Sequence, residues 1–306
     1  MTEENRYSDS LLGIGNNDKN TFKSCCSNFL IPEDNINMTS WDGIPDWYKY
    51  NKHIYYGYRV PYLNIKQLTL SCFKIHNETL NIWTHLLAAI LFFCFFIYSL
   101  IGGSDYNVYD NLSVNIFLVS AIICFSFSTI MHTYFPFSKT VCRILANFDY
   151  FGICLLITGS YVPFIYYTFY CYIEVRTFYL LGLGLCTLLS FPIILNHHCP
   201  QKFRSLIYIF LGLYGVCPII HKFVIMGDNQ ENTFITELFL IGLVAFFYIT
   251  GVLFYTSHIP EIIHRDLFNY YFSSHQLFHF FTIAGAVTHF LAIEYAYKKH
   301  INYICQ

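Results

Sequence analysis

Residues 82–101 read IWTHLLAAILFFCFFIYSLI and contain no Asp, Glu, Lys or Arg. A helix of 20 apolar residues is about 30 Å long, which matches the hydrocarbon thickness of a bilayer. Six further stretches of similar length also lack these charged residues: 112–131, 150–169, 177–195, 205–220, 238–257 and 276–293. The sequence therefore predicts an all-α, polytopic membrane protein with seven transmembrane helices. The shortest stretch, 205–220, is expected to start earlier or to tilt.

The charged residues are segregated between these stretches. They make up only 12% of the 306 residues, whereas soluble domains contain about 25%. This distribution excludes a soluble enzyme, a nucleic-acid-binding protein and a disordered chain. The twelve cysteines show no CxxC spacing, so we interpret them as small packing residues and do not expect a disulfide scaffold.

Lys and Arg near the membrane ends predict the orientation. Seven of them flank the helices on the side of the N-terminus and four on the opposite side. This bias favours a cytoplasmic N-terminus and an external C-terminus. We divide the chain into a disordered N-terminal tail (1–40), a cytoplasmic or interfacial segment (41–81), the seven-helix transmembrane domain (82–295) and an external C-terminal tail (296–306). The aromatic residues of 41–58 stand beside turn residues, as suits a membrane interface.

Polar residues at membrane depth are candidates for a functional role, because placing a polar side chain there costs free energy. With the predicted orientation, four helix ends bring such residues to the cytoplasmic leaflet. Glu78, Asn81 and His85 begin the first helix, Ser128 and His132 end the second, Asp149 stands at the start of the third, and His275 and His279 begin the seventh.

The spacing of the histidines predicts a metal site. His275 and His279 are four residues apart and share one helix face, so they can bind one ion. With His132 they complete three imidazole ligands, and a water in the fourth position makes an open tetrahedral Zn²⁺ site of the catalytic kind. Such a site suits hydrolysis of an amide or ester. Asp149 would orient the water or shuttle its proton, and Ser128 would hold a ligand ring or donate to an oxyanion.

Each of these residues also has a purely structural interpretation. The HxxxH pattern is frequent by chance, His132 can be an interfacial histidine and Asp149 a helix cap. Ser128 can bond its own backbone, while Glu78, Asn81 and His85 can act as second-shell or helix-packing residues. Haem between two facing histidines is a further rival. All of these residues are predicted at the same leaflet. This favours the metal site, because residues with unrelated structural roles would not be expected to gather there.

The remaining histidines provide a contrast. His289 follows His279 by ten residues, about 15 Å along a helix, and cannot join the same ion. His197 and His198 are interpreted as loop residues. His258 and His264 bracket Pro260-Glu261 and are weaker candidates for a place near the site.

Several blocks occur in the order of a known family: 44–47, 57–59, 76–85, 128–132, 148–153, 251–255 with Pro260-Glu261, and 274–279. They read IPDW, GYR, HNETLNIWTH, STIMH, FDYFGI, GVLFY and SHQLFH. On these blocks the sequence resembles the progestin and adipoQ receptor family, which includes the adiponectin receptors and the haemolysin III-like proteins. The resemblance covers roughly residues 44–290.

The resemblance implies seven helices with the N-terminus inside, and Zn²⁺ held by His132, His275 and His279. It also implies that Asp149 lies beside the water at the metal and that Ser128 belongs to an SxxxH motif. Adiponectin-receptor relatives are associated with ceramidase activity, and alkaline ceramidases have a similar pattern. The sequence departs from the family at Ile262, where Arg is common, and at 264–268, which replaces a glycine-containing turn; a particular hormone is therefore not carried over.

We hypothesise an intramembrane zinc hydrolase that cleaves the amide of ceramide-like lipids and acts in lipid signalling. The alternative is a receptor or membrane-fluidity sensor in which the zinc is structural. The expected partners are a membrane lipid and the bilayer, without nucleic acid. An extracellular ligand, and the choice between plasma and internal membranes, are left open.

Overall fold

The computed structural model describes residues 37–102, 108–196, 198–226, 231–264 and 267–300. Its contacts divide the chain into Met1–Asn37 and Met38–Gln306, and every element named below lies in the second unit. Residues 1–36 of the predicted disordered tail lie outside the described residues. The last part of that tail does contain regular structure, because Met38–Thr39 forms a β-strand.

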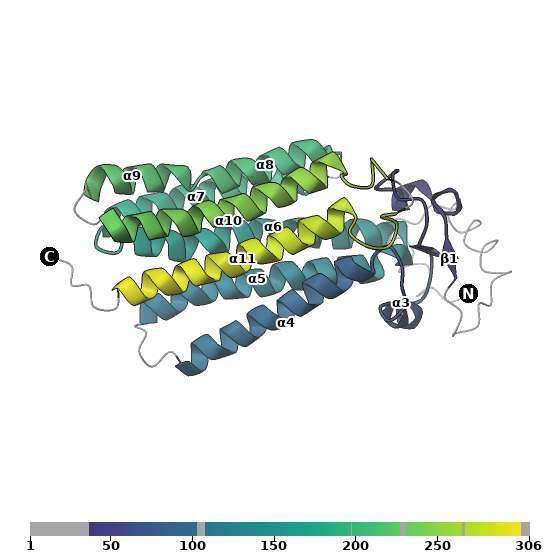
Figure 1. Ribbon diagram of the computed structural model, residues 1–306, viewed down its shortest axis with the longest axis horizontal. Coiled ribbons are helices and arrows are strands. Elements are labelled where there is room, and N and C mark those ends of the chain that lie inside the picture. The colour runs from purple at the N-terminus through teal and green to yellow at the C-terminus, as the bar shows by residue number, and fades with distance from the viewer. Residues whose placement is uncertain (1–36, 103–107, 197, 227–230, 265–266, 301–306) are drawn as a thin grey trace, which may run out of the picture. The chain divides into compact units, whose positions relative to one another are not determined.

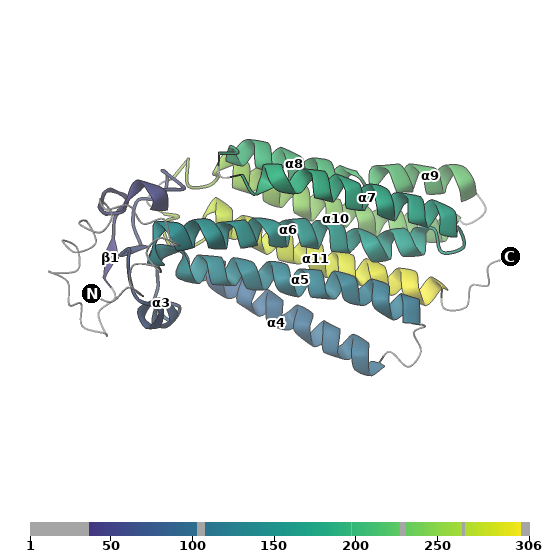
Figure 2. The same ribbon diagram turned by 180° about the vertical axis from the view of Figure 1, so that it is seen from behind.

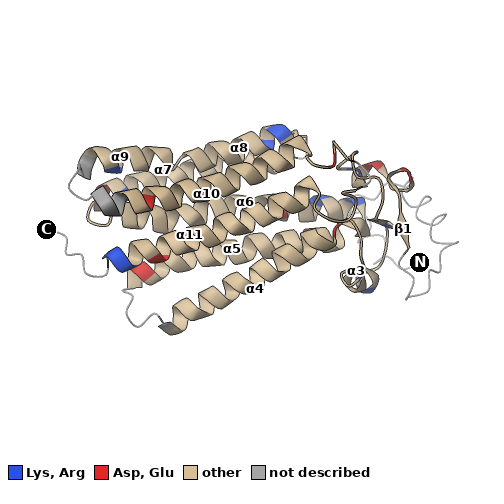
Figure 3. Ribbon diagram, in the orientation of Figure 1, with Lys and Arg blue, Asp and Glu red and all other residues tan. Residues whose placement is uncertain are grey.

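The described chain is mostly helical, which confirms the predicted fold class. Seven helical spans are long and apolar enough to cross a membrane. The helices are α4 (Thr79–Gly102), α5 (Val108–Tyr134), α6 (Lys139–Thr168), α7 (Ile173–Ile194), α8 (Gln201–Leu213), α9 (Val216–Met226), α10 (Glu231–Ser257) and α11 (Ser274–His300). They run lengthwise in one bundle (Figures 1 and 2). Lys, Arg, Asp and Glu gather at the two ends of this bundle (Figure 3).

Most helices extend beyond the charge-free stretches that predicted them. The fifth span starts early, at Gln201, and consists of α8 and α9 with a break between Leu213 and Val216. Helix α11 continues to His300, so residues 296–300, which we placed in the C-terminal tail, are helical.

Helix α6 begins ten residues before Asp149, which corrects our placement of this residue at a helix start. Ser138 caps the helix, and its side chain accepts a hydrogen bond from the Val141 amide at 3.3 Å. Asp149 therefore lies almost three turns inside α6. The interpretation of Asp149 as a helix cap is wrong for the same reason.

The interfacial segment lies at the end of the bundle where α4 begins (Figure 1). It contains the short 3-10 helices η1 (Trp41–Gly43) and η2 (Asp46–Tyr48), strand β2 (Tyr58–Arg59) and helix α3 (Ile65–Ser71). Strand β1 (Met38–Thr39), just before the segment, pairs antiparallel with β2. Its small core consists of Ile44, Tyr48, Ile54, Tyr58 and Phe135. Phe135 belongs to η4 (Phe135–Phe137), directly after α5, so the segment packs onto the end of that helix.

The main core joins α4, α5, α6 and α11. Helices α5 and α6 approach closely at Gly152, where an added Cβ would lie 2.9 Å from the Cα of Cys124. Real Cβ atoms are not found this close to a neighbouring backbone, so the packing requires glycine here. One turn nearer the interfacial segment, the same two helices carry Asp149 and Ser128.

The cysteines follow our interpretation with one exception. The described cysteines other than Cys171 are free: residues 72, 94, 124, 142, 154, 186, 199 and 217. Cys171, in the connection between α6 and α7, is disulfide-bonded. This bond was not expected from the sequence.

Candidate metal centre

Three imidazole rings meet at the end of the bundle that carries the interfacial segment. His132 comes from the last turn of α5, and His275 and His279 come from the first two turns of α11. One ring nitrogen of each histidine can be chosen so that all three lie within 4.8 Å of one another. His132 and His279 are buried and His275 is partly exposed. These are the three histidines that the sequence analysis singled out.

The carboxylate of Glu78 determines the orientation of the His132 ring. Nδ1 of His132 lies 2.7 Å from Oε2 of Glu78, which is fully buried just before α4. Because a carboxylate only accepts hydrogen bonds, Nδ1 carries the proton and the Nε2 lone pair points to the centre. Burial favours a raised pKa for Glu78, but hydrogen bonds from His132, Tyr50 and Asn81 outweigh it and hold the pKa well below its usual range.

Arg59 binds the backbone of His132 itself. Its guanidinium is fully buried and donates to the carbonyl oxygens of His132 at 2.5 Å and Thr133 at 2.8 Å, and to Ser71 Oγ at 2.9 Å. These carbonyls belong to the C-terminal end of α5, where a positive charge is stabilised. Through these hydrogen bonds of Arg59, the interfacial segment holds the end of the helix that carries the His132 ring.

His76, just before α4, is a neutral imidazole. Burial and the nearby Arg59 lower its pKa to about 3.

The third ring, that of His279, is held by α4. Its Nδ1 lies 3.3 Å from Oγ1 of Thr84. His85 stacks on His279 with ring centroids 3.5 Å apart and an angle of 8° between the planes. Both nitrogens of His85 are buried and have no hydrogen-bond partner among the described residues. The predicted trio of Glu78, Asn81 and His85 therefore surrounds the centre, since Asn81 also donates to Glu78 at 2.7 Å.

Asp149 and Ser128 form a neighbouring pair across α5 and α6. The Ser128 hydroxyl and the His132 ring are both close enough to the Asp149 carboxylate to interact with it electrostatically. Ser128 stands one helical turn before His132 on the same face, which brings the pair beside the three rings. The close packing at Gly152 is what allows this contact.

The residues present fit a zinc ion. Nε2 of His132 and Nε2 of His275 lie 3.2 Å apart. Tetrahedral zinc with nitrogen ligands at about 2.0–2.1 Å separates those ligands by about 3.3 Å. Because the Nε2 of His132 presents a lone pair, a cation among the rings satisfies it. Three imidazoles with a carboxylate behind one of them are a typical zinc donor set.

The histidines that the sequence analysis used as a contrast do not join the three rings, although one of them lies near His275. His289 faces the opposite part of the bundle, where its Nε2 donates to the carbonyl of Ser160 at 2.9 Å. His258 lies near His53, with ring centroids 5.9 Å apart, and contributes to the electrostatic surroundings of His275. His198 is a loop residue, as predicted, and His197 lies outside the described residues.

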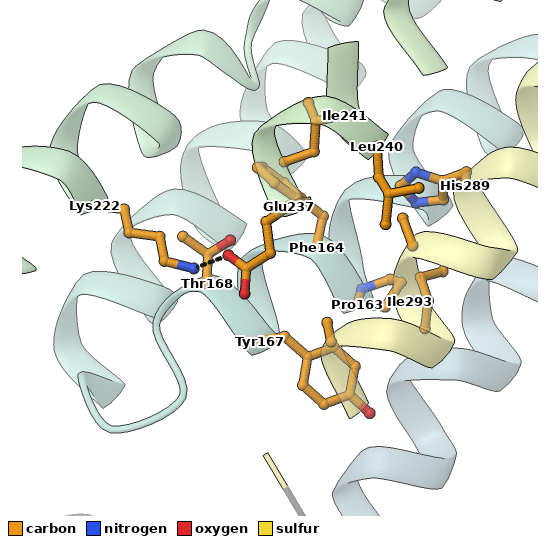
Figure 4. Close-up of a pocket in the computed structure, with 12 residues that line it drawn as sticks. Pro163, Phe164, Tyr167, Thr168, Lys222, Glu237, Leu240, Ile241, His289 and Ile293 are labelled. Carbon is orange, nitrogen blue, oxygen red and sulfur yellow. Dashed lines mark hydrogen bonds and ion pairs between the residues drawn. The ribbon is translucent and has the colours of Figure 1, made fainter. Parts of the chain in front are cut away.

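A separate cavity lies at the other end of the bundle (Figure 4). Its walls come from α6, α9, α10 and α11, and most of its lining side chains are apolar. Lys222 lies at its edge and donates to Glu237 at 2.5 Å, and Lys299 donates to the same carboxylate at 2.9 Å. This cavity is distant from the three histidines and shares none of its lining residues with them.

Comparison with known proteins agrees with the geometry. The haemolysin III-related family matches residues 73–290. The chain belongs to this family. It is 32% identical to the adiponectin receptor protein of Drosophila melanogaster over 83% of the chain and 58% of that protein. It is 32% identical to heptahelical transmembrane protein 1 of Arabidopsis thaliana over 83% of the chain and 80% of the relative.

A third relative is the human progestin and adipoQ receptor family member 3, which is 31% identical over 83% of the chain and 84% of its own length. The chain spans only about six tenths of the Drosophila protein and of progestin and adipoQ receptor-like protein 1 of Caenorhabditis elegans. The predicted resemblance is confirmed. Together with the seven apolar helices, it makes the protein an integral, multi-pass membrane protein.

The sequence analysis missed three residues that support the ligands. Arg59 and Tyr50, from the interfacial segment, contact His132 and Glu78, and Thr84 of α4 contacts His279. Arg59 is part of the GYR block that supported the resemblance, but no role was predicted for it. Its charge within a run of aromatic residues was a signal that it is buried against polar partners.

Proposed function

We propose that this protein is a zinc-dependent hydrolase of the amide bond in ceramide-like lipids. The observation that carries the proposal is the convergence of three imidazole nitrogens, with the Asp149 carboxylate close to both Ser128 and His132. His132, His275 and His279 would hold the ion. When bound, zinc supplies Lewis acidity, which activates water and polarises a carbonyl group.

The other residues supply positioning and proton transfer. In the proposed reaction the Asp149 carboxylate accepts a proton from the attacking water, whose oxygen adds to the amide carbon. The same proton passes to the amide nitrogen, the C–N bond breaks, and a fatty acid and an amine leave. Ser128 would orient the neighbouring Asp149 carboxylate, and Glu78 holds the His132 ring by a hydrogen bond.

The proposed orientation places the site at the cytoplasmic leaflet. The predicted charge bias supports this orientation, and so does the disulfide of Cys171, which follows α6 at the far end from the histidines. Disulfides persist in oxidising compartments and are rare in the cytosol. A lipid amide at the inner interface, with its acyl chain in the bilayer, would then reach the partly exposed His275.

The test is hydrolysis of a labelled ceramide by the purified protein in lipid nanodiscs. We expect turnover that is lost after zinc removal, restored by added zinc, and lost in the Asp149→Asn variant with zinc content unchanged. Turnover that survives both the chelation and the substitution would disprove the proposal.

The second candidate is a receptor in which zinc only ties α5 to α11. The names of the relatives from Drosophila and human, which call them receptors, favour this candidate. Asp149→Asn distinguishes the two. An unchanged melting temperature with lost hydrolysis supports the enzyme, whereas a protein that binds one zinc and hydrolyses no lipid amide supports the receptor.

A further inference from the structure

Glu261 is a buried carboxylate to which the proposed reaction gives no role. It lies in the connection between α10 and α11 and is fully buried. Its Oε1 accepts hydrogen bonds from Asn51 Nδ2 at 2.9 Å and from the Ser274 hydroxyl, and its Oε2 accepts one from the Ser274 amide at 2.7 Å. One side chain therefore joins the start of α11, 13 residues away, to Asn51, which is 210 residues away in the sequence.

The partners of Glu261 are all neutral. No Lys or Arg within the described ranges forms an ion pair with it. A buried carboxylate without a cation is unfavourable unless strong hydrogen bonds and a helix N-terminus compensate. Both are present, because Ser274 is the first residue of α11 and its amide is one of those that the helix leaves unpaired.

The position of Ser274 connects Glu261 to the metal centre. His275 is the next residue, so a bond to both the amide and the hydroxyl of Ser274 determines how the first turn of α11 is rotated. The same turn is held on another side by Gln276, whose Nε2 donates to the carbonyls of Asn77 at 3.0 Å and Tyr270 at 2.9 Å. Rotation of this turn decides whether the His275 ring reaches His132.

Asn51 extends the connection to the interfacial segment. Its Nδ2 donates to Glu261 and its Oδ1 accepts from the His53 amide at 3.0 Å, so both ends of the side chain are used. The neighbouring Tyr50 bonds Glu78, which orients His132. Two adjacent residues of one segment thus act on the two helices that carry the ligands.

We propose that Glu261 is a positioning residue of the metal centre, which fastens the first turn of α11 to Asn51 and thereby places His275 against His132. The proposal rests on the proposed function only in taking these histidines as the ligands of one metal ion. It holds equally whether the bound ion is catalytic or structural.

The experiment measures cobalt and zinc binding by the purified full chain in nanodiscs. Cobalt is titrated into metal-free protein and followed by its visible absorption bands, and zinc affinity is measured by competition with a chelator. The variants are Glu261→Gln and the milder Ser274→Ala, which removes one of the three hydrogen bonds and keeps the amide. Glu237→Gln is the matched control, because it also removes a hydrogen-bonded carboxylate, partly buried, at the opposite end of the bundle.

We expect Glu261→Gln to weaken zinc binding about 10- to 100-fold and to change the cobalt spectrum. Ser274→Ala should show a smaller loss in the same direction, and Glu237→Gln should keep the affinity and spectrum of the unmodified protein. A Glu261→Gln protein with unchanged affinity and spectrum overturns the proposal, even if its melting temperature falls. If Glu261→Gln does not fold, unchanged metal binding by Ser274→Ala overturns it instead.

Failure of the proposed function looks different in the same data. The protein could bind one metal ion, with a spectrum that is sensitive to Glu261, and hydrolyse no lipid amide. This result would disprove the proposed hydrolase and would support the positioning role of Glu261. If the folded, unmodified chain binds neither zinc nor cobalt, both proposals are disproved.

Discussion

The two ends of the bundle use buried polar groups in different ways. At the histidine end, polar contacts join residues from separate segments, as in the bonds of Glu78 to His132 and of Arg59 to the His132 carbonyl. At the other end, Glu237 is shared by Lys222 and Lys299 at the edge of a mostly apolar cavity (Figure 4). The first arrangement aims ring nitrogens at one point, whereas the second neutralises charges.

This contrast teaches that a buried charge at membrane depth is not by itself a sign of a reaction site. Both ends contain a carboxylate with two or more partners, fully buried at Glu78 and partly buried at Glu237. Among the described residues, only the histidine end has ring nitrogens that face one another, such as the two Nε2 atoms 3.2 Å apart. The predictions below test whether this difference in geometry becomes a difference in metal binding.

The largest effect is expected from removing a ligand. His279→Ala should abolish stoichiometric zinc binding and any zinc-dependent hydrolysis, because two imidazoles no longer make a tight zinc site. Metal content by elemental analysis of purified protein measures this. His289→Ala, at the opposite end, is the control and should retain zinc; equal zinc content in both variants would contradict the site.

Removing the group behind a ligand should have the next largest effect. Glu78→Gln replaces the acceptor for the His132 Nδ1 proton by an uncharged amide, and we expect zinc affinity to fall about 10- to 100-fold. Chelator competition measures the loss. An affinity equal to that of the unmodified protein would show that Glu78 only packs the helices.

A change in helix packing should have an intermediate effect. Gly152→Ala places a Cβ against the α5 backbone, so the helices must separate, at a cost of about 1–3 kcal/mol. Because Asp149 and Ser128 lie one turn away, hydrolysis should fall more than zinc content. Gly184→Ala is the matched control, since an added Cβ there meets nothing within 4 Å. The comparison fails if both variants lose hydrolysis equally.

The smallest effect on the metal centre is expected from the cavity end. Lys222→Met removes one of the two cations of Glu237, which Lys299 continues to neutralise. We expect a lower melting temperature and unchanged zinc affinity. Loss of zinc in this variant would show that the two ends are coupled, and the contrast drawn above would then be wrong.

Much of the metal centre followed from short-range patterns. The spacing of His275 and His279 and the end of α5 at His132 follow from one helix each, so the sequence predicted them. The placement of Asp149 at a helix start was wrong, because a charge-free stretch marks the apolar part of a helix and not its ends. Lys139 and Arg143 extend α6 into the interface, where charged side chains are tolerated.

The sequence by itself determined the seven spans and the set of candidate ligands, because hydropathy and helical periodicity are local properties of the chain. Only the tertiary structure decided which polar groups hold those ligands. Asn51 and Glu261 are 210 residues apart, and Arg59 and His132 are 73 apart. Contacts at such separations depend on how the helices and the interfacial segment pack, and no local pattern records that packing.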